Sequence, residues 1–371
     1  MSLKFRNLNN SWVHKDNNPN NKSLLFVKKV FQYLQNGESV WLERNNKIYK
    51  HQIQKGKKNF PSLFFRTGGT SGKKKWVEHN EFSIASSVES ISKTLNADDI
   101  SSWCCLPLNH VGGMIQVFRA LHTGGKILFN EYRNLLGEIP SKFNENQWIS
   151  LVPTQLHNLV SSPKGRDNLR GFRGIFVGGA ALSENLSNKC QKYNIPVYPT
   201  YGMSETAGMI SLLDSDSFQR GIRGVGKVLP HAQMTLESLS NRILVKAESM
   251  SLNLVKPTQW LKTHDFGHQD NHENWFINGR LDRYIISGGE NVDPFMIERI
   301  LDLYEPVDEC LVVGEEDERW GQRIVAYVTP DDVNHEHLIK YARDNLEPRL
   351  VPKEWKVVKA LPLNQMGKPK V

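Results

Sequence analysis

The chain has 371 residues, of which 39% are hydrophobic and 23% charged, and its formal net charge at pH 7 is +8. This length and composition exclude a disordered chain and suffice for two domains with sizeable cores. No stretch reaches the eighteen apolar residues of a membrane span, and the first residues lack the apolar segment of a signal peptide, so we expect a cytoplasmic protein without stable membrane insertion.

The basic residues are scattered and do not alternate with aromatic residues, so we expect no nucleic-acid partner. A small polyanion such as a nucleotide fits the positive charge, as does a basic surface without a specific partner. The four cysteines show no metal-ligand spacing, which indicates reduced thiols. The sequence leaves the oligomeric state open.

Residues 1–60 are polar and rich in asparagine, and they predict a small N-terminal cap with one amphipathic helix near residues 24–34. The apolar run at residues 63–65 predicts a short strand. Residues 75–79 predict a second strand, which forms a hairpin with the first around a glycine-rich loop.

This loop reads Arg-Thr-Gly-Gly-Thr-Ser-Gly-Lys-Lys-Lys at residues 66–75. Glycines let the backbone turn tightly and bring its N–H groups close to an anion, while hydroxyls add donors that can also reach a metal, and lysines add charge. The common nucleotide P-loop needs four residues between its first glycine and its Gly-Lys pair, and this loop lacks that spacing. The composition predicts a phosphate cradle, with a solvated surface loop as the alternative.

Beyond the hairpin, predicted helices and strands alternate. Asn80 is a candidate cap for a helix whose apolar positions recur at helical spacing. Strands are predicted at residues 103–108, 126–129, 148–152, 174–177 and 196–198, with helices at 117–121, 156–159 and 183–190. This alternation is typical of a parallel sheet flanked by helices, in which ligands bind at the carboxyl ends of the strands. The segments at those ends, which we expect to share one site, are His110, Thr154, residues 178–180 and residues 201–205.

Residues 221–262 predict short strands with turns, which indicate a small β element. A turn predicted at residues 279–282 suggests a boundary, with an N-terminal domain at 1–281 and a C-terminal domain at 282–371. The second domain is predicted as a compact α/β unit. Its elements are a helix begun by Asp293 and Pro294, strands at 310–313, 324–328 and 355–358, and a helix at 335–346.

From about residue 60 onward, seven segments follow one another along the chain: residues 67–75, 106–110, 178–180, 201–205, Asp265 with 279–282, 288–291 and 361–368. In this order they resemble seven motifs of the adenylate-forming superfamily, which comprises acyl-CoA synthetases, adenylation domains and luciferases. Those motifs are the phosphate loop, pocket histidine, adenine loop, Tyr-Gly-x-Thr-Glu box, ribose and hinge motifs, post-hinge loop and catalytic-lysine motif. The resemblance implies an α/β fold with a large N-terminal domain of mixed and parallel sheets flanked by helices, a small β element, and a small C-terminal α/β domain.

The resemblance also implies two half-reactions that use ATP, Mg²⁺ and coenzyme A. A carboxylate first attacks the α-phosphate of ATP, which gives an acyl-adenylate and pyrophosphate. The thiol of coenzyme A then attacks the acyl carbon and releases AMP. Both steps build up negative charge, which cations and N–H donors stabilise.

For the nucleotide, the resemblance implies that Ser204 contacts the α-phosphate and that Glu205 binds Mg²⁺. Asp265 would accept hydrogen bonds from the ribose hydroxyls with support from Arg280, and Tyr201 would stack on adenine. The other implied residues are Thr67, Gly68, Gly69, Thr70, Ser71, Gly72 and Lys73 around the phosphates, with Thr70 also near the metal, and Gly178, Gly179, Ala180, Gly202 and Met203 around adenine.

For catalysis, the resemblance implies that Lys368 bridges the attacking carboxylate and the α-phosphate. A rotation of the C-terminal domain about Asp282 would withdraw Lys368 after adenylation. The same rotation would bring Gly288 and Gly289 to the thiol of coenzyme A.

For the acid, the resemblance implies a pocket formed by His110, Thr154 and Gly179. Three runs, at residues 67–72, 106–114 and 151–155, resemble the 2-succinylbenzoate–CoA ligases of cyanobacteria and plastids, which serve phylloquinone and menaquinone synthesis. A second substrate carboxylate would need a further cation, for which Arg119 and Lys126 are candidates. The sequence departs from the family in a shortened segment before residue 60, in Ser204 for threonine, and in Asn109 where the ligases often have an aromatic residue.

Two other functions remain open at this stage: a ligase or stand-alone adenylation domain for another aryl or fatty acid, and a non-catalytic nucleotide-binding protein. Each key residue also has a structural interpretation. These are a core histidine for His110, a helix cap for Glu205, core packing for Tyr201, a metal site with His264 and His268 for Asp265, and a tail charge for Lys368.

Overall fold

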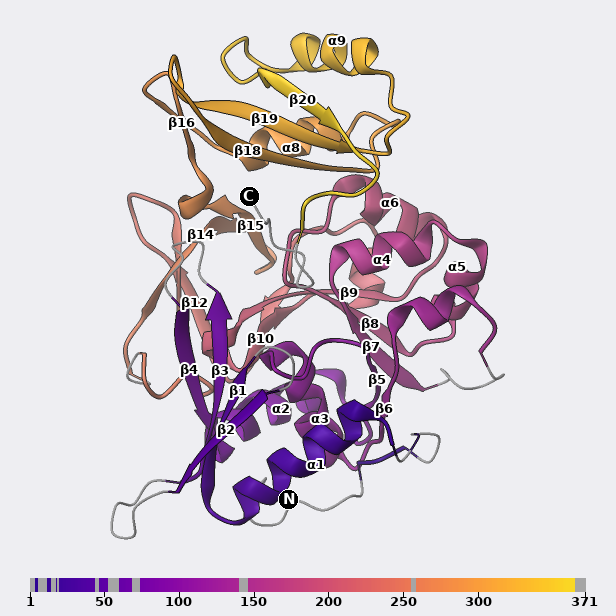
Figure 1. Cartoon of the computed structure of the whole chain (residues 1–371), viewed down its shortest axis with the longest axis vertical. Coiled ribbons are helices and arrows are strands. Elements are labelled where there is room, and N and C mark those ends of the chain that lie inside the picture. Colours follow the sequence, from indigo (N-terminus) through magenta and orange to yellow (C-terminus); the bar gives the residue numbers. More distant parts are fainter. Residues whose placement is uncertain are drawn as a thin grey trace.

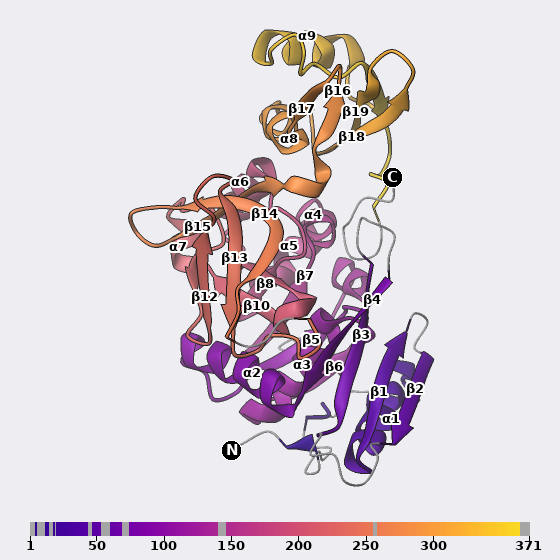
Figure 2. The same cartoon turned by 90° about the vertical axis from the view of Figure 1, so that its left-hand side faces the viewer.

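The computed structural model describes residues 4–5, 12–14, 18, 20–43, 47–52, 60–68, 74–139, 146–254 and 258–363. Their strands form four sheets, three in a large N-terminal domain and one in a small C-terminal domain above it (Figure 1). In Figure 2 the sheet of β12–β15 lies at the left of the large domain and the sheet of β1–β4 at the right. None of the described helices is long and apolar enough to cross a membrane.

The first sheet has the order β2-β1-β3-β4 and is covered by helix α1. The predicted N-terminal helix is confirmed as α1, which Asn21 caps through its side chain. The N-terminal region is more than a cap, because β1 pairs in parallel with β3 and so extends the hairpin sheet. The elements are α1 (Lys22–Gln35), β1 (Glu38–Glu43), β2 (Lys47–Gln52), β3 (Ser62–Gly68) and β4 (Lys74–Asn80).

The second sheet has seven strands in the order β11-β10-β9-β8-β7-β5-β6, and the five from β9 to β6 are parallel. The predicted parallel sheet is therefore confirmed. Its strands are β5 (Ser101–Cys104), β6 (Ile127–Phe129), β7 (Gln147–Leu151), β8 (Gly174–Val177), β9 (Val197–Met203), β10 (Gly208–Leu212) and β11 (Lys227–Val228). Its helices are α2 (Glu81–Leu95), α3 (Val111–Thr123), η3 (Tyr132–Leu136), α4 (Pro153–Val160), α5 (Pro163–Arg170), α6 (Glu184–Lys192), η4 (Ser204–Thr206) and α7 (Ser215–Gln219).

Strand β8 shows why this sheet is buried on both faces. Ile175 and Val177 pack in the cluster that contains leucines of α4, α5 and α6, whereas Phe176 packs on the opposite side with Ile91 of α2. Successive side chains of a strand point to opposite faces, so a strand that is apolar throughout needs a cover on each. Helices α2 and α3 also share a cluster with the first sheet, and they therefore lie between the two sheets.

Three predicted boundaries were wrong. The strand predicted at 103–108 ends at Cys104, before Pro107, which has no N–H for a sheet hydrogen bond. Helix α3 begins at Val111 rather than near residue 117 and includes both glycines that were expected to precede it. Strand β9 continues to Met203, because residues 200–203 pair with the antiparallel β10.

The third sheet is antiparallel, with the order β12-β13-β14-β15. It is the small β element expected from the sequence, extended by two strands. Gly279 and Arg280 belong to β15 and not to a turn; the turn is the short helix η5 that follows them. The elements are β12 (Ala232–Leu236), β13 (Arg242–Ala247), β14 (Leu261–Gln269), β15 (Trp275–Arg280) and η5 (Leu281–Arg283).

The fourth sheet belongs to the small domain and has the order β17-β16-β19-β18, with β20 alongside β19. Asp293 caps α8 as predicted, and Ile297 and Leu301 of that helix are fully buried against the sheet. The elements are β16 (Ile285–Ser287), β17 (Glu290–Val292), α8 (Pro294–Asp302), β18 (Glu309–Asp317), β19 (Gly321–Thr329), α9 (His335–Asn345) and β20 (Glu354–Val357).

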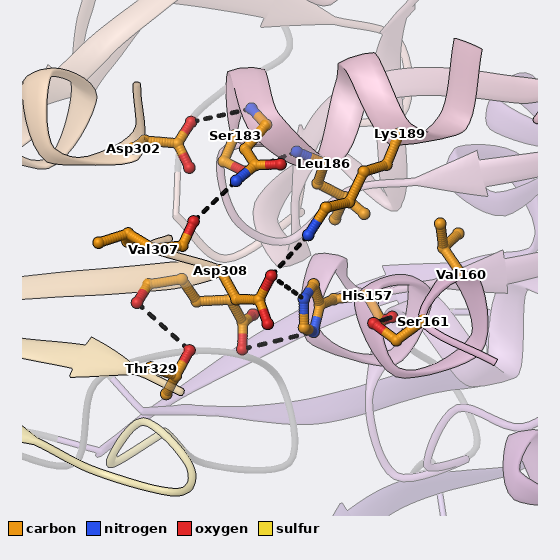
Figure 3. Close-up of polar contacts among 12 residues, drawn as sticks. His157, Val160, Ser161, Ser183, Leu186, Lys189, Asp302, Val307, Asp308 and Thr329 are labelled. Atoms are coloured by element: carbon orange, nitrogen blue, oxygen red, sulfur yellow. Dashed lines mark hydrogen bonds and ion pairs between the residues drawn. The ribbon is translucent and has the colours of Figure 1, made fainter. Parts of the chain in front are cut away.

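The small domain meets the large one through polar groups, which Figure 3 shows in close-up. The Asp308 carboxylate lies 2.5 Å from Lys189 Nζ of α6 and 3.7 Å from His157 Nε2 of α4. Asn185 donates from its backbone N–H to Asp302 Oδ2 at 3.1 Å and from its side chain to the Val307 carbonyl at 2.7 Å. We call these contacts the polar interface.

Candidate functional site

Four of the predicted segments follow the carboxyl ends of parallel strands in the second sheet. His110 lies beyond β5 at the N-cap position of α3, Thr154 follows β7 at the start of α4, residues 178–180 follow β8, and Ser204 follows β9. The strands β9, β8, β7 and β5 are adjacent and parallel, so these segments lie along one edge of the sheet. Loops at that edge are the usual ligand site of such sheets.

A hydrogen-bonded chain connects the second and third sheets beside this edge. The Tyr201 hydroxyl of β9 donates to Asp265 Oδ2 of β14 at 2.6 Å, and Arg280 Nη1 of β15 lies 3.1 Å from Asp265 Oδ1. Arg280 also holds Asp282 through Nε and Nη2, at 2.9 and 2.8 Å. Asp265 and Arg280 face each other directly in the register of β14 and β15. Tyr201 and Arg280, which lie 64 and 15 positions from Asp265 in sequence, thus meet on its carboxylate.

In this hydrogen-bonded group, the Asp265 carboxylate is a hydrogen-bond acceptor that its neighbours hold in place. Burial, reinforced by the Asp265 carboxylate, raises the pKa of Tyr201 well above its usual value, so the hydroxyl stays protonated and donates. A carboxylate offers about four acceptor positions, and Tyr201 and Arg280 use one on each oxygen. Asp265 can therefore still accept from two hydroxyl groups of a ligand.

The turn after β9 carries the candidate metal ligand. The carboxylate of Glu205 forms no hydrogen bond or ion pair with any residue in the described ranges. Mg²⁺ binds through one or two carboxylates together with substrate phosphates and water, and a free carboxylate of this kind fits that donor set. Over the same ranges, no three His, Cys, Asp or Glu side chains cluster as a metal site would require, which leaves the alternative site at His264, Asp265 and His268 unsupported.

Two residues hold this turn that the sequence does not mark as part of the site. The His79 side chain of β4 lies with its Nε2 2.7 Å from the Ser204 carbonyl oxygen, and the backbone N–H of Ser251 donates to the Glu205 carbonyl at 2.7 Å. The sequence predicts His79 only as part of a hairpin strand. No local pattern identifies its role, because its partner lies 125 residues further along the chain.

Arg119 of α3 is a buried cation, with only 2% of its surface exposed. Its guanidinium carbon lies 5.0 Å from the ring centre of Phe176, while Nε and Nη1 have no hydrogen-bond partner among the described residues. Burial lowers its pKa to about 10, so it remains charged at neutral pH. Lys126, the other candidate, lies exposed just before β6, at the amino edge of the sheet and opposite to the site.

Several predicted site residues are not brought to this edge, or lie beyond what the structure describes. Gly288 and Gly289 form the two-residue turn of the β16–β17 hairpin, both with positive φ (61° and 83°). Figures 1 and 2 show β16 leading from η5 away from the large domain, so this turn is remote from the sheet edge. The Thr67 hydroxyl donates across its hairpin to the Lys75 carbonyl. Gly69, Thr70, Ser71, Gly72, Lys73 and Lys368 fall outside the described residues.

Comparison with known proteins identifies two family regions. Residues 9–246 match the AMP-binding enzyme family, and residues 296–368 match the AMP-binding enzyme C-terminal domain. The chain belongs to the AMP-binding enzyme family. It is therefore an enzyme of the AMP-forming acyl-CoA ligase family, with the mixed α/β fold of adenylate-forming enzymes.

Two characterised members of this family match at the same identity. A 2-succinylbenzoate–CoA ligase of Staphylococcus epidermidis is 28% identical, over 86% of this chain and 71% of the relative. An indoleacetate–CoA ligase of Aromatoleum aromaticum is also 28% identical, over 88% of this chain and 69% of the relative. These relatives give no support to the expected similarity with the cyanobacterial and plastid ligases.

Solved structures of family members agree with the fold. The o-succinylbenzoate CoA synthetase of Bacillus subtilis in complex with its acyl-adenylate intermediate is 27% identical and superposes with a TM-score of 0.69, over 83% of this chain and 67% of that chain. The same enzyme has been solved in complex with ATP and a magnesium ion, with a TM-score of 0.68 and 26% identity.

Proposed function

We propose that this protein is an ATP-dependent acid–CoA ligase that forms an acyl-adenylate and then a CoA thioester, and that its acid is 2-succinylbenzoate. The hydrogen-bonded group of Tyr201, Asp265 and Arg280 at the sheet edge carries the proposal, together with the Glu205 carboxylate on the turn after β9, which has no partner among the described residues. It combines a fixed acceptor for hydroxyl groups with an anionic metal ligand, which are the two features that recognition of MgATP requires.

In the adenylation step, Asp265 accepts from the ribose hydroxyls, and Arg280 and Tyr201 hold its carboxylate in place. Because its hydroxyl is tied to Asp265, the Tyr201 ring has a fixed plane on which adenine can stack beside residues 178–180. Ser204 donates to the α-phosphate. Glu205 holds Mg²⁺, which when bound offsets the charge that develops on the phosphates.

The step between the half-reactions involves the small domain. We place the domain boundary at residues 281 and 282, so that rotation about Asp282 withdraws Lys368 after adenylation. The same rotation brings Gly288 and Gly289, remote in the present orientation, to the thiol of coenzyme A. The polar interface, rather than an apolar one, fits a contact that must open and close.

Selection of the acid rests on Arg119. A buried cation without a charged partner is costly unless a ligand supplies the anion. 2-Succinylbenzoate has two carboxylates, of which one is activated and the other is free to pair with a guanidinium. We assign that second carboxylate to Arg119. Lys126 is discarded because its side chain is exposed and water already solvates its charge.

Pyrophosphate exchange with a panel of acids tests the substrate. We expect 2-succinylbenzoate to support exchange at least 100-fold better than benzoate, indoleacetate or a fatty acid, since each of these lacks the second carboxylate. Exchange driven equally by the monoacids would instead establish the alternative, a ligase or adenylation domain for another aryl or fatty acid.

A non-catalytic nucleotide-binding protein would show no exchange with any acid.

Lys368→Ala separates the two half-reactions. Pyrophosphate exchange measures adenylation, and thioester formation from preformed acyl-adenylate and coenzyme A measures the second step. Adenylation should be lost, while conversion of preformed acyl-adenylate to the thioester should remain within about threefold of the unmodified enzyme. Equal loss of both steps would overturn the role given to Lys368.

A further inference from the structure

We propose that His79 is a positioning residue, which holds the Ser204–Glu205 turn against the strand that follows the glycine-rich loop. The proposal rests on the proposed function, in which this turn contacts the α-phosphate and Mg²⁺. It adds a residue that touches neither ligand and acts by setting the place of those that do.

The position of His79 admits little movement. The side chain is fully buried on β4, with Nε2 2.7 Å from the Ser204 carbonyl oxygen and Nδ1 3.2 Å from Ser83 Oγ. Ser83 is itself held in the first turn of α2, where Asn80 donates its N–H to the Ser83 hydroxyl oxygen at 3.1 Å. One imidazole thus joins a strand, a helix start and the candidate ligand turn.

The direction of the hydrogen bond follows from its partner. A carbonyl oxygen can only accept, so Nε2 carries the proton and donates to Ser204. Burial lowers the pKa of His79 to about 4, which keeps the ring neutral at physiological pH and leaves Nδ1 as an acceptor within reach of the Ser83 hydroxyl. That hydroxyl also lies 3.1 Å from the Asn80 carbonyl oxygen, and it can give its single proton to either acceptor. A buried ring that stays neutral suits positioning and not proton transfer.

A second connection joins the same strand to the next peptide of the turn. Ser251 donates its N–H to the Glu205 carbonyl at 2.7 Å, and its hydroxyl accepts from the Glu78 N–H at 3.1 Å. Leu252 returns an N–H to the Glu78 carbonyl at 3.0 Å. Strand β4 therefore holds two successive carbonyls, that of Ser204 directly and that of Glu205 through Ser251.

This arrangement has a consequence for the triphosphate. Strand β4 begins at Lys74, directly after the segment expected around the phosphates, while the turn carries the groups assigned to the α-phosphate and the metal. His79 joins the two elements that hold these groups, which are strand β4 and the turn after β9. A displacement of about 1 Å between them is enough to lower the rate about 100-fold.

Two substitutions of similar size separate the two ring nitrogens. In His79→Gln the amide NH₂ can occupy the place of Nε2 and donate to Ser204, whereas in His79→Asn it can reach only the place of Nδ1. We expect His79→Gln to keep adenylation, measured by pyrophosphate exchange, within about fivefold. His79→Asn should lose about 100-fold in kcat for adenylation, with conversion of preformed acyl-adenylate changed less than about threefold.

Hydrogen exchange supplies a readout that does not depend on turnover. In His79→Asn the amides of residues 203–207 should exchange at least tenfold faster than in His79→Gln, in the absence of nucleotide. Equal exchange in the two variants, or equal loss of both half-reactions in His79→Asn, overturns the proposal.

Glu205→Ala distinguishes this outcome from failure of the proposed function. If Glu205→Ala adenylates normally, the metal role of Glu205 is wrong, yet the exchange rates of the turn still decide the role of His79. If Glu205→Ala is inactive while His79→Asn retains full adenylation, the role of His79 alone is rejected.

Discussion

At the residue scale, the clearest conflict between stability and function lies at Arg119. Its charge is buried over the Phe176 ring, and two of its nitrogens lack partners among the described residues. A cation–π contact recovers only about 2 kcal/mol when desolvated, which is less than the cost of removing a guanidinium from water. In the proposed function, a substrate carboxylate would pair with this guanidinium and offset the cost of its burial.

Arg119→Met should therefore separate stability from activity. Methionine keeps most of the volume without the charge, so we expect the free energy of unfolding to stay the same or to rise by up to about 2 kcal/mol. The KM for 2-succinylbenzoate should rise about 100-fold, while exchange with benzoate is unchanged. Arg173→Met, at an exposed arginine beside Trp148, is the control and should change neither quantity. An equal loss with both acids would contradict the assignment.

Two buried histidines predict how stability depends on pH. Burial lowers the pKa of both His79 and His231 to about 4. The unfolded chain binds their protons near pH 6.5, so between pH 6.5 and 4 the unfolded state binds more protons, and stability falls as the pH falls. One pH unit corresponds to about 1.4 kcal/mol, so each histidine removes roughly 3 kcal/mol by pH 4. Urea unfolding over this range should show a shallower pH dependence in His231→Gln, and an unchanged slope would contradict the prediction.

At the scale of a single element, helix α3 is placed by its close contact with the loop before it. A Cβ on Gly113 would lie 2.3 Å from the Pro107 carbonyl oxygen, whereas one on Gly112 would meet only Leu106 Cδ1 at 3.5 Å. The missing side chain at Gly113 lets the helix pack directly on the loop. Since His110 stands at the N-cap position directly before this helix, the same contact sets the position of the candidate pocket histidine.

The two adjacent glycines make a matched pair. Gly112→Ala should be neutral or stabilising by up to about 1 kcal/mol, because alanine favours the helix. Gly113→Ala should destabilise by about 1–3 kcal/mol through overpacking, and should raise the KM for the acid as α3 moves away from the loop. Thermal unfolding and pyrophosphate exchange measure both effects. If the two variants had the same stability and the same KM, the loop at Pro107 would be able to move aside without a loss of free energy.

At the scale of the whole molecule, the small domain contacts the large one at the polar interface. Burial raises the pKa of Asp302 and of Glu309, because it disfavours the charged form of each carboxylate in the interface. The last described residues, in yellow in Figure 1, lead from β20 down towards the large domain. We expect this orientation to be the one that presents the C-terminal segment for adenylation.

Asp308→Asn tests this expectation, because it removes the charge that Lys189 and His157 face. A loss of 1–2 kcal/mol of interface energy would change the ratio of domain orientations about 5- to 30-fold. Adenylation should become slower relative to thioester formation. The distribution of distances between labels placed on the two domains should become broader. The control is Glu138→Gln, at the exposed ion pair with Lys164 outside the interface. The same change in both variants would show that the interface does not set the orientation.

The sequence by itself determined the parallel sheet, the helix starts at Asn80 and Asp293, and the edge at which the candidate site lies. These features are local: apolar spacing distinguishes strands from helices, side-chain caps mark helix starts, and parallel strands must end on the same side. Strand ends were less accurate, since the continuation of β9 to Met203 depends on its pairing with β10. The tertiary structure alone decided that Tyr201 meets Asp265, that His79 meets Ser204, and that Arg119 is buried while Lys126 is not. These contacts join residues on different elements, and their geometry is set by how whole sheets pack, which no spacing along the chain encodes.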